Sequence, residues 1–131
     1  MRLFDAVARW PAVVLWMALL FALSSIPSEV VQPSGAIPLD KVAHFCFYGV
    51  LGALLAGAIG RRHIGWGAVI ALAVAIGALY GVSDEFHQRF VPGRDASVDD
   101  WIADVRGTLA GGIVAVTLRA WAGSMILPPD R

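Results

Sequence analysis

Residues 40–59 read DKVAHFCFYGVLGALLAGAI, a stretch whose charged side chains are confined to its opening turn. A helix of about 20 mainly apolar residues is long enough to cross the hydrocarbon core of a bilayer. The whole chain has the same character: 58% of its 131 residues are hydrophobic, 15% are charged, and the mean hydropathy is +0.71. A soluble domain of this size could hardly keep that much apolar surface away from water. The sequence therefore predicts an integral membrane protein.

Three further apolar stretches reach the length of about 17 residues that a spanning helix needs. They are residues 10–26, 65–82 and 99–121. With residues 40–59 they predict an all-α integral membrane protein that folds as one domain, a four-helix transmembrane bundle. The first helix carries no charged residue and is predicted to be an anchor. A cleaved secretory signal is the alternative for it, because Arg2 and Arg9 precede the apolar run.

Small residues recur four positions apart within the predicted helices. Such spacing places them on one side of a helix, where they allow close contact with a neighbouring helix in the membrane. A compact bundle is therefore expected. The positions are Gly49, Ala53 and Gly57, then Ala73, Gly77 and Gly81, and finally Gly107 and Gly111.

Net charge and cysteine content exclude several classes of function. The formal net charge is zero, so the chain lacks the broad basic surface that nucleic-acid binding usually needs. No nucleic-acid partner is predicted. Cys46 is the single cysteine, which excludes both an intramolecular disulfide and a cysteine-based zinc site.

The distribution of charge predicts the orientation of the bundle. Six basic residues and two acids fall on the face that holds both termini and the turn at residues 61–63. Four basic residues and eight acids fall on the opposite face. Because basic residues are enriched in cytoplasmic loops, the sequence predicts an N-in/C-in topology. The residues of the cytoplasmic face are Arg2, Arg9, Arg61, Arg62, Arg119 and Arg131 with Asp5 and Asp130.

Polar side chains gather at the outward ends of the second, third and fourth predicted helices. An ionisable group near the centre of a span costs about 2.5–3.5 kcal/mol on insertion scales, and less near the interface, so these residues need compensation or a function. At helical spacing they form three groups: Asp40, Lys41, His44 and Tyr48; Tyr80, Asp84, Glu85, His87 and Gln88; and Asp100, Asp104 and Thr108.

Two interpretations of this polar constellation stay open. In the first, the side chains satisfy one another, for example through Lys41 with Asp84 or Asp104, and hold the bundle together. In the second they form a site, because histidines and carboxylates suit acid–base chemistry. The catalytic candidates are then His44, Asp84, Glu85 and His87, and the binding candidates are Asp40, Lys41, Tyr48, Gln88, Arg94, Asp100 and Asp104.

The chemistry of such a site has two versions. His44, His87 and Glu85 would supply the two histidines and one acid that are common in catalytic zinc sites. A divalent metal is therefore a candidate cofactor, although no cofactor is fixed by the sequence. Alternatively, Arg94 with Arg89 and Lys41 would bind the phosphate of an anionic lipid, because arginine makes bidentate contacts with phosphate oxygens.

The segment between the third and fourth predicted helices has its own pattern. Pro92 and Gly93 indicate a turn, and Ser97 is a plausible N-cap for the helix that follows. Arg94 is predicted to fold back over the polar cluster. Arg106 lies about two turns into the fourth helix, where it either extends to the interface or pairs with an acid such as Asp99.

Three motifs follow one another along the chain. They read Asp40-Lys41-x-x-His44-Phe45-x-x-Tyr48-x-x-Leu51-Gly52, then Tyr80-Gly81-x-x-Asp84-Glu85-x-His87-Gln88-x-Phe90-Val91-Pro92-Gly93-Arg94, then Ser97-x-x-Asp100-x-x-Ala103-Asp104-x-x-Gly107. In this combination and order, the chain resembles the VanZ-like family, named for a member associated with teicoplanin resistance. The resemblance implies a multi-pass protein of the bacterial cytoplasmic membrane that acts in the cell envelope, with glycopeptide susceptibility as one expected effect. It supplies no reaction, so whether the protein is an enzyme stays open.

The leading functional hypothesis is a protein that binds or modifies a lipid or lipid-linked headgroup, such as a cell-wall precursor, at the extracytoplasmic face. One alternative is a membrane scaffold whose polar cluster is structural. Another is a small proton-coupled transporter, because buried carboxylates and histidines can form proton relays. The sequence leaves the oligomeric state open.

Overall fold

The computed structural model describes residues 9–27, 39–60 and 64–126. Regular structure in these residues consists of α2 (Trp10–Ser24), α3 (Leu39–Ile59), α4 (Trp66–Gln88) and α5 (Val98–Ile126). Helices α3, α4 and α5 are long and apolar enough to cross a membrane, whereas α2 has 15 residues. The prediction of an all-α fold is confirmed for the described residues, and three of the four predicted spans are long and apolar enough to cross a membrane.

The helix bounds differ most from the sequence prediction in α4. This helix continues to Gln88, well past the predicted end at residue 82, so residues 83–88 are helical. Asp84, Glu85 and Gln88 lie in that last part, which a hydropathy pattern assigns to a connection, and they are buried. Helix α2 ends at Ser24, two residues before its predicted end at residue 26, and α5 continues to Ile126, five residues past its predicted end at residue 121.

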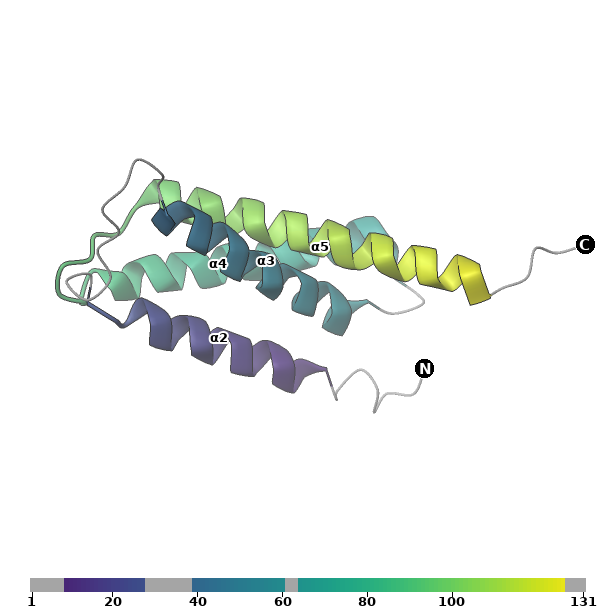
Figure 1. Ribbon diagram of the computed structural model, residues 1–131, viewed down its shortest axis with the longest axis horizontal. Coiled ribbons are helices and arrows are strands. Elements are labelled where there is room, and N and C mark those ends of the chain that lie inside the picture. The colour runs from purple at the N-terminus through teal and green to yellow at the C-terminus, as the bar shows by residue number, and fades with distance from the viewer. Residues whose placement is uncertain (1–8, 28–38, 61–63, 127–131) are drawn as a thin grey trace, which may run out of the picture.

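The four helices lie roughly along the long axis of the molecule (Figure 1). The last turns of α2 and α4 and the first turns of α3 and α5 meet at one end, which we call the polar end because it carries Asp40, Asp84, Asp100 and Asp104. At the opposite end, Arg9 and Arg119 donate to the carbonyl oxygen of Gly57 at 3.0 and 3.3 Å. The acidic residues of the described chain therefore lie towards the polar end, where basic residues such as Lys41 and Arg94 accompany them, whereas the opposite end carries Arg9 and Arg119. Several charged residues used in the orientation argument lie outside the described residues: Arg2, Asp5, Glu29, Arg61, Arg62, Asp130 and Arg131.

Glycines bring the helices into close contact. A Cβ atom added at Gly52 would meet the backbone of Thr108, and one added at Gly111 would meet the carbonyl oxygen of Gly49, so α3 and α5 touch through their backbones. A Cβ at Gly77 would lie 2.6 Å from Thr108 Oγ1, which brings α4 equally close to α5. The predicted packing role of the small residues is confirmed for Gly49, Gly77 and Gly111, and Gly52 is a contact that the four-residue spacing did not include. Gly57 is the exception, because a Cβ there would meet no described atom within 4 Å.

The outer surface of the bundle is apolar, as expected for side chains that face lipid. Leu15 of α2, Leu79 of α4 and Leu118 of α5 are 70%, 73% and 58% exposed. The interior is built from Leu51, Leu55 and other small or aliphatic side chains. The charged side chains of the interior are concentrated at the polar end.

Candidate functional site

Helices α3 and α5 each place an acid or base on one face at intervals of about one turn, and the glycine contacts bring those faces together. Lys41 Nζ lies 2.9 Å from Asp100 Oδ1. One turn deeper, His44 Nδ1 lies 2.8 Å from Asp104 Oδ1. The two ion pairs therefore form consecutive rungs between α3 and α5. The predicted partners of Lys41, Asp84 and Asp104, were wrong, because the register of α5 places Asp100 opposite Lys41.

The two rungs differ in their exposure to the surroundings. The Lys41 side chain is 41% exposed, so the outer rung lies at the rim of the bundle. The side chains of His44 and Asp104 are 10% and 0% exposed. Asp40 Oδ1 lies 4.0 Å from His44 Nε2, on the more exposed side of the ring. The inner rung is thus a buried pair with a second carboxylate beside it.

Helix α4 adds a third set of polar side chains to the same interior. Asp84, Glu85 and Gln88 are all buried. Gln88 Nε2 donates to Asp84 Oδ2 at 3.3 Å, and the backbone N–H of Ser97 donates to Glu85 Oε2 at 2.6 Å. Ser97 Oγ in turn accepts from the backbone N–H of Asp100 at 3.4 Å, which is the predicted capping bond of α5. Glu85 thereby fixes the connection between α4 and α5.

His87 does not join this group, which corrects the predicted set of His44, Glu85 and His87. Its Nε2 lies 2.9 Å from Ser25 Oγ, and its ring packs on Phe21 with centroids 4.3 Å apart. The physical reason is helix geometry. Each residue of an α-helix is rotated by about 100° from the one before it. Two residues apart, Glu85 and His87 therefore lie on nearly opposite sides of α4, and Glu85 faces the interior while His87 faces the end of α2.

Four buried polar atoms at the polar end have no hydrogen-bond partner among the described residues. They come from three helices that face one another. Each would normally bind a protein group or a small ligand, because an unsatisfied buried polar group is costly. The atoms are Tyr48 Oη, Asp84 Oδ1, Glu85 Oε1 and Asp104 Oδ2.

A cavity of about 920 Å³ opens at the polar end above these residues. Its apolar wall includes Leu20 and Leu23 of α2 and Phe47 of α3. Its polar wall draws on all four helices and on the connection at residues 89–97. The polar lining consists of Ser24, Asp40, His44, Tyr48, Asp84, Gln88, Arg94, Asp95, Ser97 and Asp100.

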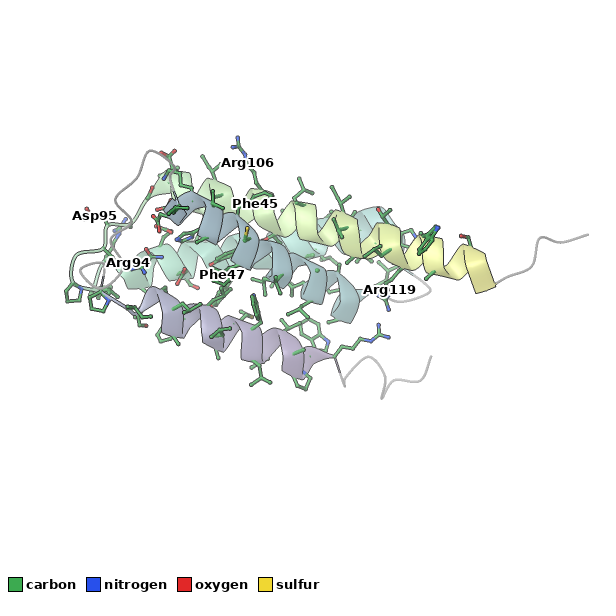
Figure 2. The ribbon with its side chains drawn as sticks, in the orientation of Figure 1. Phe45, Phe47, Arg94, Asp95, Arg106 and Arg119 are labelled. Atoms are coloured by element: carbon green, nitrogen blue, oxygen red, sulfur yellow. The ribbon has the colours of Figure 1, made fainter. Side chains whose placement is uncertain are left out.

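Arg94 is the arginine that lines this cavity (Figure 2). Its Nε donates to the carbonyl oxygen of Ile26 at 3.0 Å, which ties the connection between α4 and α5 to the end of α2. Arg106, in contrast, is exposed and points away from the bundle (Figure 2). Of the two predicted arrangements for Arg106, the structure shows the outward one. Arg89 is also exposed and does not line the cavity.

Comparison with known proteins identifies the family of the chain. A family model described as VanZ/LLP1 matches residues 3–119. The chain belongs to the VanZ/LLP1 family. No curated protein and no solved structure matches it. The resemblance inferred from the three motifs is confirmed. All residues of the polar end of this VanZ/LLP1 protein lie within residues 3–119, the part of the chain that matches the family model.

Sequence reasoning missed the contribution of α2 to the site of this VanZ/LLP1 protein. Besides lining the cavity, α2 offers backbone carbonyls to the neighbouring helix: Tyr80 Oη donates to the carbonyl oxygen of Met17 at 2.6 Å. Ser25, just after α2, contacts His87. The serines at the end of an otherwise apolar stretch were the available signal, because they place hydroxyl groups at the depth of the other polar side chains. The predicted role of α2 as an anchor is therefore too narrow.

Proposed function

We propose that this protein binds the headgroup of a lipid or lipid-linked cell-wall precursor in the cavity at the polar end. The observation that carries the proposal is the division of the cavity into an apolar wall and a polar wall. A lipid headgroup with the start of its acyl or prenyl chain has the same division. The apolar wall suits the chain, and the hydrogen-bonding groups of the polar wall suit the headgroup.

Arg94 is the group we assign to the phosphate of such a ligand. The bond from Nε to Ile26 uses one of the five N–H donors of the guanidinium and orients the group at the cavity. The terminal nitrogens suit bidentate contacts with phosphate oxygens. Lys41 lies at the rim, but its charge is balanced by Asp100, so Arg94 is the main positive group that we assign to the phosphate.

The proposal places the protein in the cytoplasmic membrane of a bacterium, with the cavity open to the extracytoplasmic side and α2 as a fourth span. Basic side chains favour the cytoplasmic side, and Arg9 and Arg119 lie at the end opposite the cavity. A protein that binds cell-wall precursors there would alter susceptibility to glycopeptides such as teicoplanin. A transport role is less well supported, because residues 45–59, 66–82 and 107–118 carry no charged side chain that would continue a polar path.

The orientation predicts which residues a membrane-impermeant maleimide reaches in intact cells. In a Cys46→Ala background, Asp95→Cys is expected to react, because Asp95 is exposed at the polar end. Ser124→Cys, exposed near the opposite end of α5, is expected to react only after the membrane is permeabilised. The reverse pattern of labelling would show that the polar end faces the cytoplasm.

Headgroup binding is tested with two arginine variants that differ in position. Arg94→Ala is expected to weaken binding of a polyprenyl phosphate at least tenfold, because a hydrogen bond to a charged group contributes about 1.5–3 kcal/mol. Arg106→Ala removes the same side chain from the outer surface of α5 and is expected to leave the affinity within about twofold. Native mass spectrometry of the purified protein in detergent, with phosphatidylglycerol and uncharged diacylglycerol as further ligands, measures both. Equal binding by the two variants, or no preference for phosphate over diacylglycerol, would contradict the proposal.

A further inference from the structure

Three buried carboxyl groups lie close together at the base of the cavity. Asp84, Glu85 and Asp104 are 4%, 8% and 0% exposed, and each has one oxygen without a partner among the described residues. The hydroxyl of Tyr48, a residue 1% exposed, is also unpaired there. These atoms come from α3, α4 and α5, so the fold directs them to one place from three sides.

The positive charge available to these carboxylates is small. His44 forms an ion pair with Asp104 when its ring is protonated. Lys41 is occupied at the rim by Asp100, which is itself an acid. If all three buried carboxyl groups are ionised, a protonated His44 balances one of them. Charges inside a membrane protein are normally paired or neutralised, so the other carboxyl groups need protons or a bound cation close by.

We propose that His44, Glu85 and Asp104 bind a divalent transition-metal ion. One ring nitrogen of His44 and one oxygen of each carboxylate all lie within 4.8 Å of one another, and all three residues are buried. Their convergence on one ion would satisfy the unpaired oxygens of Glu85 and Asp104. This donor set differs from the one predicted from sequence, since Asp104 takes the place of His87.

The surrounding groups suit the metal as well as its ligands. The second oxygen of Glu85 is held by the backbone N–H of Ser97. Asp40 Oδ1 lies 4.0 Å from Nε2 of His44, so a small rotation of the exposed Asp40 side chain would let it accept a hydrogen bond from Nε2 while Nδ1 faces the ion. Ligating histidines are usually oriented in this way by a carboxylate. Binding replaces the hydrogen bond between His44 and Asp104, because a ligating ring nitrogen must give up its proton.

The type of donors selects the class of ion. One imidazole nitrogen with two carboxylate oxygens suits Zn²⁺ or Mn²⁺, whereas Ca²⁺ sites are built from six to eight oxygens. His44 and the neighbouring Tyr48 and Asp84 also line the cavity, so the ion would lie at its base. This inference goes beyond headgroup binding and does not depend on it, because the ion is held by the chain's own side chains.

Metal binding is tested with the metal alone, without lipid. The full chain is purified in detergent, treated with EDTA, desalted, and titrated with ZnCl₂ or MnCl₂ by calorimetry, with the melting temperature and the bound metal content measured in parallel. We expect one ion per chain with a micromolar or lower Kd, and a higher melting temperature with metal. If the folded wild-type protein binds neither ion, the proposal is overturned. Protonation is then the way in which the buried carboxyl groups are neutralised.

Variants test the ligand set. Glu85→Gln and Asp104→Asn keep the shape of the side chain and are expected to lower the affinity at least tenfold. Asp99→Asn makes the same change as Asp104→Asn at an exposed position of the same helix, and is expected to keep the wild-type affinity. Circular dichroism checks that each variant is folded. Wild-type affinity in a folded Glu85→Gln or Asp104→Asn variant would overturn the assignment; if these variants unfold, the titration of the wild-type chain decides.

Discussion

Gly52→Ala is expected to destabilise the bundle by about 3 kcal/mol or more, because the added methyl group has no space between α3 and α5. It would meet the backbone of Thr108, which cannot rotate away as a flexible side chain can. The two helices would have to separate, and the ion pairs of Lys41 and His44 with α5 would stretch with them. Thermal unfolding in detergent, followed by circular dichroism, measures the loss.

Gly57→Ala provides a matched control on the same helix. A Cβ at Gly57 meets no described atom within 4 Å, so its effect is expected to be small, within the range of about 1 kcal/mol that separates glycine from alanine in helix propensity. The comparison removes the general effect of replacing glycine in α3. Similar melting temperatures for the two variants would show that α3 and α5 do not meet at Gly52.

The sequence predicts which side chains share a helix face, but it does not predict which residues meet across two helices. The period of the α-helix places Asp40, Lys41 and His44 at one end of α3 and Asp100 and Asp104 at one end of α5. The pairing of Lys41 with Asp100 depends on how far α5 slides along α3. That register is set by which glycines of the two helices meet. Because each helix has several glycines, the sequence alone does not show which of them are in contact.

The error at His87 has a related cause. All the polar clusters were correctly expected at one end of the bundle, and a common end suggests a common site. Each helix, however, has neighbours on different sides. In α4 the side that carries Asp84, Glu85 and Gln88 faces the interior, whereas Tyr80 and His87 contact α2 and the residue after it. Only the position of α2 reveals this division.

The role of α2 in the cavity could not be read from its sequence. A helix that is apolar on all sides has no face that the pattern distinguishes. In α2, Val13 and Leu20 are buried, while Leu15 and other residues of the same type are exposed. Which side packs against the bundle is set by the helices already in place, so the apolar wall of the cavity appears only in three dimensions.

His44→Ala is expected to destabilise the metal-free protein by about 3–5 kcal/mol, because it leaves the Asp104 carboxylate buried without its partner. Lys41→Ala removes the cation of the neighbouring rung on the same helix. Asp100 is 7% exposed but the Lys41 side chain is 41% exposed, so water reaches this rung and that loss is expected to be smaller than the loss for His44→Ala. Chemical unfolding of both variants in detergent with EDTA measures the difference.

Equal losses for the two variants would contradict the view of His44–Asp104 as a buried pair.

A purely structural interpretation explains only some of the residues at the polar end. Pairing with α5 accounts for His44 and Lys41, and it makes both of them part of what holds the bundle together. It does not account for the unpaired oxygens of Asp84 and Glu85, which lie on α4 and belong to neither rung. Gln88 and the backbone of Ser97 account for one oxygen of each of these acids, whereas a bound ligand or ion would account for the other.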